Sequence, residues 1–133
     1  MYKVLVIDDD PIFQYIAEKI FKKTNLFEET TCFLDANSAL EYLVQNKDNP
    51  DVLPDVILLD IYMPALNGWE FINQYEQISD SLGKRVPIYI LTSSVDPKEI
   101  ARSKSHPSVK KFTSKPMTFE FIHDLYNDCQ VAS

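Results

Sequence analysis

The chain has 133 residues, of which 45% are hydrophobic and 25% charged, with a formal net charge of −7 and a sequence pI of about 4.7. This length and composition are typical of one globular domain with a single core. The acidic balance argues against nucleic acid and against an anionic membrane surface as partners, because both require a basic protein face. The apolar runs have the length of strands, so we expect no membrane-spanning segment.

The N-terminus and the cysteine count favour a cytoplasmic protein. The first residues enter a strand pattern at once, so we expect no signal peptide. Cys32 and Cys129 are too few for a disulfide framework, and we expect both to be reduced. We expect Cys32 to be a small core residue in a strand and Cys129 to be an exposed thiol.

The first half of the chain predicts two strand–helix units. Residues 3–7 have the apolar pattern of a buried strand, and residues 28–33 have that of a weaker strand. Asp10 and Pro11 suit the N-cap and the first position of a helix, and a second helix is predicted over residues 37–45. In the first helix the apolar residues that recur at helical spacing are Ile12, Phe13, Ile16, Ala17, Ile20 and Phe21.

The second half of the chain adds three strands and three helices. Strands are predicted over residues 55–60, 86–92 and 109–113. Helices are predicted over residues 68–75, 97–104 and 118–129, with Thr118 as the cap of the last one. The last helix is more apolar than one buried stripe requires, which indicates core packing first and a partner surface second.

Strand–helix alternation predicts an α/β fold with a parallel sheet and helices on both faces. The strands at residues 3–7, 55–60 and 86–92 are almost continuously apolar, as inner strands are. The strands at residues 28–33 and 109–113 carry charges and hydroxyls, as edge strands do. A flavodoxin-like, doubly wound sheet of five strands in the order 2-1-3-4-5, with five helices, satisfies both patterns and makes the first and third strands neighbours.

This strand order brings three carboxylates to one edge of the sheet. Asp8 and Asp9 follow the first strand, and Asp60 ends the third. Ligands of such sheets bind beyond the carboxyl ends of the strands, where the winding reverses. Like charges in one cleft repel one another, and a hard cation such as Mg²⁺, which prefers oxygen ligands, relieves the repulsion. The simpler alternative is that these carboxylates are solvated and cap the next helix.

Two more polar residues stand at strand ends on the same edge. Thr92 closes the fourth strand, and Lys115 follows the fifth. A hydroxyl and an ammonium group can both hold phosphoryl oxygens. A carboxylate can act as a nucleophile and form an acyl phosphate. The complete set therefore favours phosphoryl chemistry at a carboxylate.

Over nearly its whole length the chain resembles the receiver domain of two-component response regulators. The likeness rests on the segments VLVIDDD, VILLDIYMPALNGWEF, ILTSS and FTSKPM. It implies a single receiver domain over residues 1–133, similar to the stand-alone chemotaxis receivers and without an output domain. It also implies a phosphoacceptor switch with no enzyme activity beyond its own phosphorylation and dephosphorylation.

The same resemblance implies the roles of the acidic residues and the partners. Asp60 is expected to accept a phosphoryl group from the phosphohistidine of a sensor histidine kinase or a histidine phosphotransfer protein. Mg²⁺ is expected to bind Asp9, Asp60 and the backbone carbonyl of Tyr62, with Asp8 helping through water. The signal is expected to pass by contact to an unknown downstream protein, with a homodimer as a further candidate assembly.

The resemblance extends to the residues that respond to phosphorylation. Thr92 is expected to bind a phosphoryl oxygen and to shift toward it, and Lys115 is expected to pair with the phosphate. The Lys115–Pro116 peptide bond is expected to be cis. Phe112 occupies the position of the switch aromatic residue, but it lacks the hydroxyl of the commoner tyrosine, so we expect it to switch by packing alone.

Tyr62 is a departure from the family, in which a small or polar residue is common at this position. We expect its side chain to face the site and to shield an acyl phosphate from water, with Ser94 contributing little. Among the other conspicuous residues, we expect Trp69 to be a packing residue, and His106 and His123 to be surface residues.

Two other function classes fit the fold less well. Haloacid-dehalogenase-like phosphatases carry a second aspartate two residues after the nucleophile, where this chain has Tyr62, and they also have a cap domain. A flavin-binding module needs a phosphate-cradling loop after the first strand. The segment DDDPIF would repel that phosphate.

Overall fold

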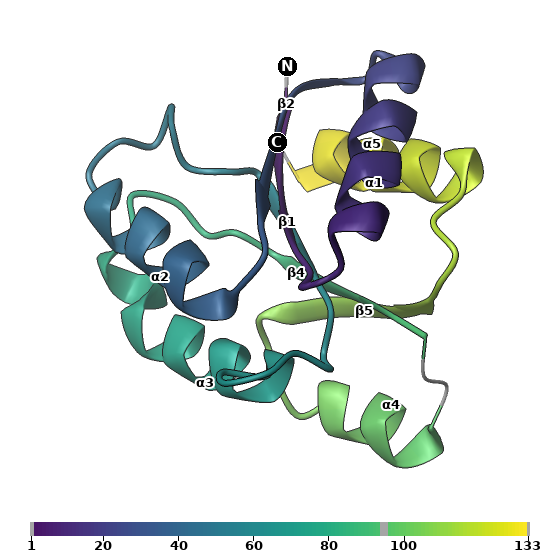
Figure 1. Cartoon of the computed structure of the whole chain (residues 1–133). Coiled ribbons are helices and arrows are strands. Elements are labelled where there is room, and N and C mark those ends of the chain that lie inside the picture. The colour runs from purple at the N-terminus through teal and green to yellow at the C-terminus, as the bar shows by residue number, and fades with distance from the viewer. Residues whose placement is uncertain (1, 94–95, 133) are drawn as a thin grey trace.

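The computed structural model of the chain describes residues 2–93 and 96–132 (Figure 1). Its strands are β1 (Tyr2–Ile7), β2 (Phe27–Phe33), β3 (Val56–Leu59), β4 (Ile88–Thr92) and β5 (Val109–Ser114). Its helices are α1 (Pro11–Thr24), α2 (Ala36–Gln45), α3 (Gly68–Ile78), α4 (Pro97–Ser103) and α5 (Phe119–Ala132), with a 3₁₀ turn, η1, at Ser79–Ser81.

The sheet has the predicted order β2-β1-β3-β4-β5, and every pairing is parallel. All residues of β3 and β4 are buried, whereas β2 and β5 are largely half-buried or exposed. The difference follows from position, because inner strands are covered on both faces and edge strands are not. The flavodoxin-like fold predicted from strand composition is therefore confirmed.

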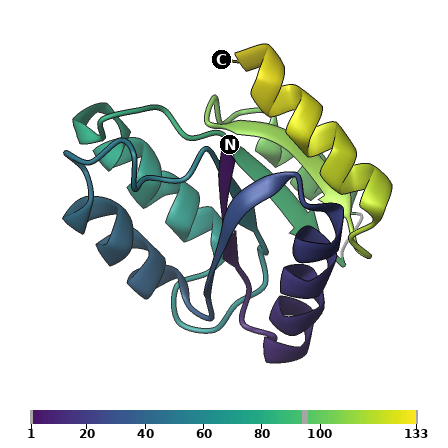
Figure 2. The ribbon, with the colours of Figure 1, turned by 90° about the horizontal axis from the view of Figure 1, so that it is seen from above.

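Four of the helices cover the two faces of the sheet in pairs, and α4 lies next to β5 (Figures 1 and 2). Helices α2 and α3 lie on one face, and α1 and α5 lie on the other. Each pair encloses its own core cluster: one contains Leu43 and Phe71, and the other contains Phe21 and Leu125. Burial of these apolar residues against the sheet is the main contribution to the stability of the fold.

Several helices begin at the residues that the sequence predicted. The Asp10 carboxylate accepts a hydrogen bond from the backbone N–H of Ile12, and Pro11 occupies the first helical turn. The Thr118 hydroxyl accepts one from the backbone N–H of Phe121 at the start of α5. These caps satisfy N–H groups that have no partner inside the helix.

Helix α1 departs from the pattern read from its apolar residues. Ala17 and Phe21 are buried, but Ile12 and Ile16 are exposed. The polar Gln14 is buried in their place. Apolar residues on this helix therefore form two faces, one in the core and one in contact with solvent. Among the described residues, no helix has both the length and the apolar content needed to cross a membrane.

Two other expectations are corrected by long-range contacts. His106 is not a solvated surface residue: its ring stacks on Trp69 with 5.9 Å between centroids, and its Nδ1 lies 2.9 Å from Glu76 Oε1. Cys129 is half-buried rather than exposed. Burial is the main reason why the pKa of its thiol rises to about 11, and burial likewise raises that of Cys32 to about 12. Both thiols are free and, at neutral pH, protonated.

Gly68, the first residue of α3, allows the helix to pack closely against the end of β3. A Cβ atom built on Gly68 would lie 2.6 Å from Ile61 Cα and 2.7 Å from the Asp60 carbonyl oxygen. Both are backbone atoms, which cannot move aside as the end of a flexible side chain can. The position therefore requires glycine because of close approach rather than because of its backbone angles.

We expect Gly68→Ala to lower the free energy of unfolding by about 2 kcal/mol, because the added methyl group must displace the backbone around Asp60. Urea unfolding of the variant and the wild type measures the difference. Gly83→Ala is the matched control, since its Cβ would meet Lys47 O at the less severe distance of 3.1 Å. An equal or larger loss in Gly83→Ala would contradict the argument.

Candidate functional site

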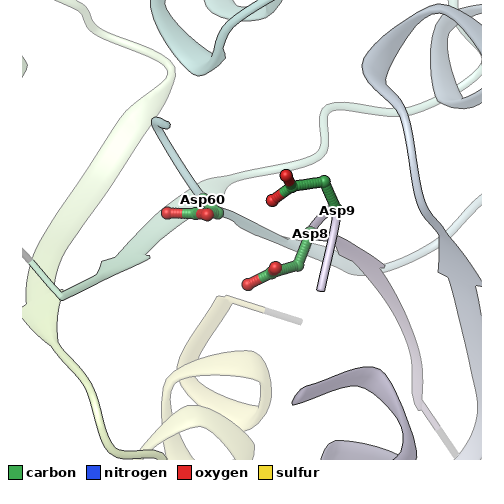
Figure 3. Close-up of side chains that lie close together, drawn as sticks. All are labelled: Asp8, Asp9 and Asp60. Carbon is green, nitrogen blue, oxygen red and sulfur yellow. The ribbon is translucent and has the colours of Figure 1, made fainter. Parts of the chain in front are cut away.

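Three aspartates meet beyond the carboxyl ends of two neighbouring strands. Asp8 and Asp9 directly follow β1, and Asp60 directly follows β3, which pairs with β1. Each offers a carboxylate oxygen, and these oxygens all lie within 4.8 Å of one another (Figure 3). Asp8 and Asp60 are buried, whereas Asp9 is exposed. The predicted convergence of the three carboxylates is therefore present in the structure.

Lys115 is held at the same site by two contacts. Its Nζ donates to Asp8 Oδ2 at 2.7 Å, and its backbone N–H donates to the Thr92 carbonyl oxygen at 2.8 Å. The second contact ties the chain after β5 to the end of β4. The peptide bond between Lys115 and Pro116 is cis, as the resemblance implied.

Asp60 is in an environment that disfavours its charged form. Burial raises the pKa of its carboxyl group, and the neighbouring charge of Asp8 raises it further. Lys115 and the backbone N–H groups of Tyr62 and Ile61 lower the pKa in part, but the net shift is upward. The cluster thus brings together more carboxylate groups than the single ammonium group of Lys115 can pair with.

The donor set fits a hard divalent cation. Carboxylate oxygens are the ligands that Mg²⁺ prefers, and the excess negative charge supplies the attraction. Asp9 and Asp60 have the best placement for direct contact, since the second oxygen of Asp8 is engaged by Lys115 and its first accepts from the Asp10 N–H. Binding by the Tyr62 carbonyl remains a prediction.

The other predicted residues occupy different parts of the rim. Thr92 is fully buried at the end of β4, and Phe112, on β5, is half-buried against the core. The Tyr62 ring is half-exposed, and its hydroxyl donates to Glu99 Oε1 on α4 at 2.6 Å. Ser94 lies outside the described residues.

Two residues that sequence reasoning missed also reach this site: Phe13 was assigned only to helix packing, and Gln14 was given no role. The ring centroid of Phe13 lies 4.1 Å from Lys115 Nζ, a cation–π distance. The Gln14 side-chain amide donates to backbone carbonyls at the ends of β1 and β2. Both lie in the first turns of α1. The signal that could have found them is their position four to six residues after Asp8 and Asp9, where a helix turns back over the site.

Comparisons with known proteins agree with this geometry. The family model described as "Response regulator receiver domain" matches residues 4–127. A two-component response regulator from Cytophaga hutchinsonii, of known structure, is 31% identical, with a TM-score of 0.88 and coverage of 97% of this chain and 96% of that one.

Two curated relatives are larger proteins. The probable C4-dicarboxylate response regulator DctR of Halalkalibacterium halodurans is 33% identical over 121 residues, which are 90% of this chain and 47% of that protein. The sensor histidine kinase CheAY of Helicobacter pylori is 30% identical over 121 residues, which are 91% of this chain and 14% of that protein. The chain thus spans less than half the length of these two relatives.

We expect Asp60→Asn to raise the free energy of unfolding of the metal-free protein at pH 7 by about 1 kcal/mol or more, because it removes a buried like charge. The sign of this change in stability follows from the raised pKa of Asp60 in the folded state. In the wild type, stability is fully present below the unfolded pKa, near 3.8, and is lost as pH rises through the folded pKa. The advantage of the variant should therefore shrink as pH falls toward that value.

Denaturant unfolding with and without roughly millimolar Mg²⁺ checks this charge argument. Mg²⁺ should stabilise the wild type and have little effect on Asp60→Asn or Asp9→Ala. Asp10→Asn is the control, since it removes one exposed charge, keeps a capping side chain and should retain the Mg²⁺ effect. An Asp60→Asn protein that is less stable than the wild type at pH 7 would refute the argument.

Proposed function

Because the chain belongs to the response regulator receiver family, we propose that it is a phosphoacceptor switch of a two-component phosphorelay, with Asp60 as the phosphorylated residue. The observation that carries this proposal is the position of Asp60. It follows a central strand, is nearly buried, and faces both an acidic pair and Lys115. Among the carboxylates of this edge, Asp8 is already engaged by Lys115 and Asp9 is exposed, which supports the choice of Asp60 as the nucleophile.

In the proposed step, a carboxylate oxygen of Asp60 forms a bond to the phosphorus of a phosphohistidine. The P–N bond of the donor breaks, and its electron pair stays on the imidazole nitrogen, which takes up a proton. The product is an acyl phosphate on Asp60. Hydrolysis later breaks the bond between phosphorus and the carboxylate oxygen, as a water oxygen bonds to phosphorus and inorganic phosphate leaves.

The surrounding residues have roles that their contacts support. Bound Mg²⁺ would be held by Asp9 and Asp60 and would supply positive charge next to the phosphoryl oxygens. Lys115 donates to Asp8 at rest, and its charge lowers the pKa of Asp60, which supports a role in pairing with a phosphate on Asp60. Thr92 offers a buried hydroxyl at the end of β4. Acceptance and loss of the phosphoryl group are the only chemistry proposed, with no separate substrate.

We propose a sensor histidine kinase or a histidine phosphotransfer protein as the donor, and contact with a downstream protein as the output, in the cytoplasm. The exposed face of α1 supports a protein partner. Ile12, Tyr15 and Ile16 share this face at helical spacing and are 69%, 61% and 48% exposed. Apolar residues that gather next to a reactive site are typical of an interaction surface.

We expect Asp60→Asn to abolish phosphorylation. Wild-type protein incubated with acetyl phosphate, or with phosphoramidate as a small donor with a P–N bond, should gain the mass of one phosphoryl group when Mg²⁺ is present. The variant should gain none, because an amide oxygen does not form a stable acyl phosphate. Intact-mass spectrometry measures the difference.

Asp10→Asn is the matched control, because it changes a neighbouring aspartate that caps α1 and lies outside the cluster. It should be phosphorylated as the wild type is. Retention of the mass gain in Asp60→Asn would show that another residue is the acceptor, and the proposal would fail.

We also expect Tyr62 to slow the loss of the phosphoryl group. Tyr62 lies two residues after Asp60, and its hydroxyl donates a hydrogen bond to Glu99 on α4, which restrains the ring. In the proposed role, the bulk of this ring limits the access of water to the acyl phosphate. Tyr62→Asn should therefore speed decay several-fold, on the order of 1 kcal/mol in the barrier. The measurement is loss of phosphorylated mass after the donor is removed, at fixed Mg²⁺.

Tyr62→Phe separates the bulk of the ring from its hydrogen bond. It keeps the ring and removes the donor to Glu99. Decay as slow as in the wild type would assign the protection to bulk, and faster decay would assign it to the tether. If Tyr62→Asn decays no faster than the wild type, the ring does not shield the phosphate.

A further inference from the structure

The side chain of Gln14 is buried behind the acidic site and bound to the backbone of two strands. It is 5% exposed. Its Nε2 lies 3.1 Å from Val6 O, 3.2 Å from Asp8 O and 3.0 Å from Phe33 O. Two N–H bonds are thus directed at three carbonyl oxygens, so at least one hydrogen is shared between two acceptors.

The Asp8 carbonyl is the important one of these three acceptors. It belongs to the peptide unit that joins Asp8 to Asp9. Since a peptide unit is planar, fixing this carbonyl also fixes the direction in which the chain enters Asp9. The N–H of Asp8 is fixed as well, because it donates to Phe33 O at 3.1 Å.

Gln14 therefore restrains the backbone of Asp9, whose side chain is not restrained by packing. Asp9 is exposed, so packing does not hold its side chain in place. Its carboxylate can stay near that of Asp60 only if the backbone that carries it is held. The Asp10 N–H, which donates to Asp8 Oδ1, restrains one side of this backbone. The Gln14 amide and the Phe33 carbonyl, which the Gln14 amide also contacts, hold the other.

The contacts of Gln14 indicate a role beyond filling space. Within the described part of the chain, no protein group donates to its buried Oε1, so the side chain is bound to the protein through its N–H groups. An apolar residue at this position would leave the three carbonyls without the amide donor, and buried carbonyl groups without a donor lower stability.

We propose that Gln14 is a positioning residue for the cation site: its amide orients the Asp8–Asp9 peptide so that the Asp9 carboxylate stays close to that of Asp60. This inference rests on the proposed function, which supplies the reason for a cation at the site. Residues that orient metal ligands without touching the metal commonly change metal affinity by tenfold or more when they are replaced.

The test is the Mg²⁺ affinity of Gln14→Met, which keeps the length of the side chain and removes its donors. Titration of the full chain with MgCl₂, followed by the backbone amide resonances around Asp9 and Asp60, gives the dissociation constant. We expect this dissociation constant to rise about tenfold, which means that Mg²⁺ binds more weakly. Phosphorylation by acetyl phosphate at low Mg²⁺ should slow in parallel and recover at high Mg²⁺.

Phe21→Leu is the matched control for lost stability. Phe21 is buried in the same helix, two turns away, in the core cluster on the α1 and α5 face. The Phe21→Leu substitution should lower the free energy of unfolding and leave the Mg²⁺ dissociation constant unchanged. If Gln14→Met is destabilised but binds Mg²⁺ as tightly as the wild type, Gln14 has only a structural role and the inference is overturned.

A wild-type measurement keeps the test decisive if Gln14→Met does not fold. The side-chain amide resonances of Gln14 should shift as Mg²⁺ saturates the site, whereas those of Gln45 and Gln74, which are exposed, should not. Absence of a Gln14 shift while Asp9 responds would overturn the inference alone. Absence of any response to Mg²⁺ in the wild type would overturn the proposed function and this inference with it.

Discussion

The close placement of Asp8 and Asp60 is the constraint on which the rest of the site depends. Two carboxylates are buried at the ends of adjacent parallel strands, where the sheet geometry gives them no freedom to separate. Like charges in a poorly solvated place are unfavourable. The structure relieves this only in part, with the Lys115 ammonium on Asp8 and backbone N–H groups on Asp60. What remains is a local excess of negative charge that a cation can neutralise.

The contacts around the site can be understood as responses to this constraint. Lys115 is bound on one side by Asp8 and on the other by the face of the Phe13 ring, so its charge is kept where it is needed. Gly68 lets α3 begin directly against the Asp60 backbone, which holds the loop after β3 close to the sheet. The repulsion among the carboxylates lowers stability at one edge of the sheet, and the two apolar cores on opposite faces of the sheet compensate for this loss. Functional sites commonly show this division.

The fold could be predicted from the sequence because its strongest signals are local. The continuous apolar runs at residues 55–60 and 86–92 identify inner strands, and the polar residues of the second and fifth strands identify edges. Strand order then brings Asp8, Asp9 and Asp60 together without any knowledge of distances. The start of α1 could also be predicted from the sequence, because Asp10 and Pro11 act on their immediate neighbours.

The features that could not be predicted depend on partners far away in the sequence. Nothing near His106 indicates that Glu76 and Trp69 lie beside it. Gln14 interrupts the apolar face of α1, and its burial makes sense only once the carbonyls of two strand ends are known to face it. Spacing alone placed Ile12 and Ile16 with the other apolar residues, whereas the structure leaves them in solvent.

The hydrogen bond between Tyr62 and Glu99 joins the loop behind the proposed phosphoacceptor to α4. Tyr62, two residues after the proposed phosphoacceptor, is thereby anchored to α4. If Tyr62 shields the acyl phosphate as proposed, any substitution that changes the lifetime of the phosphorylated state would also change how α4 is restrained. The lifetime of the proposed signal and the position of α4 would then be coupled through one side chain.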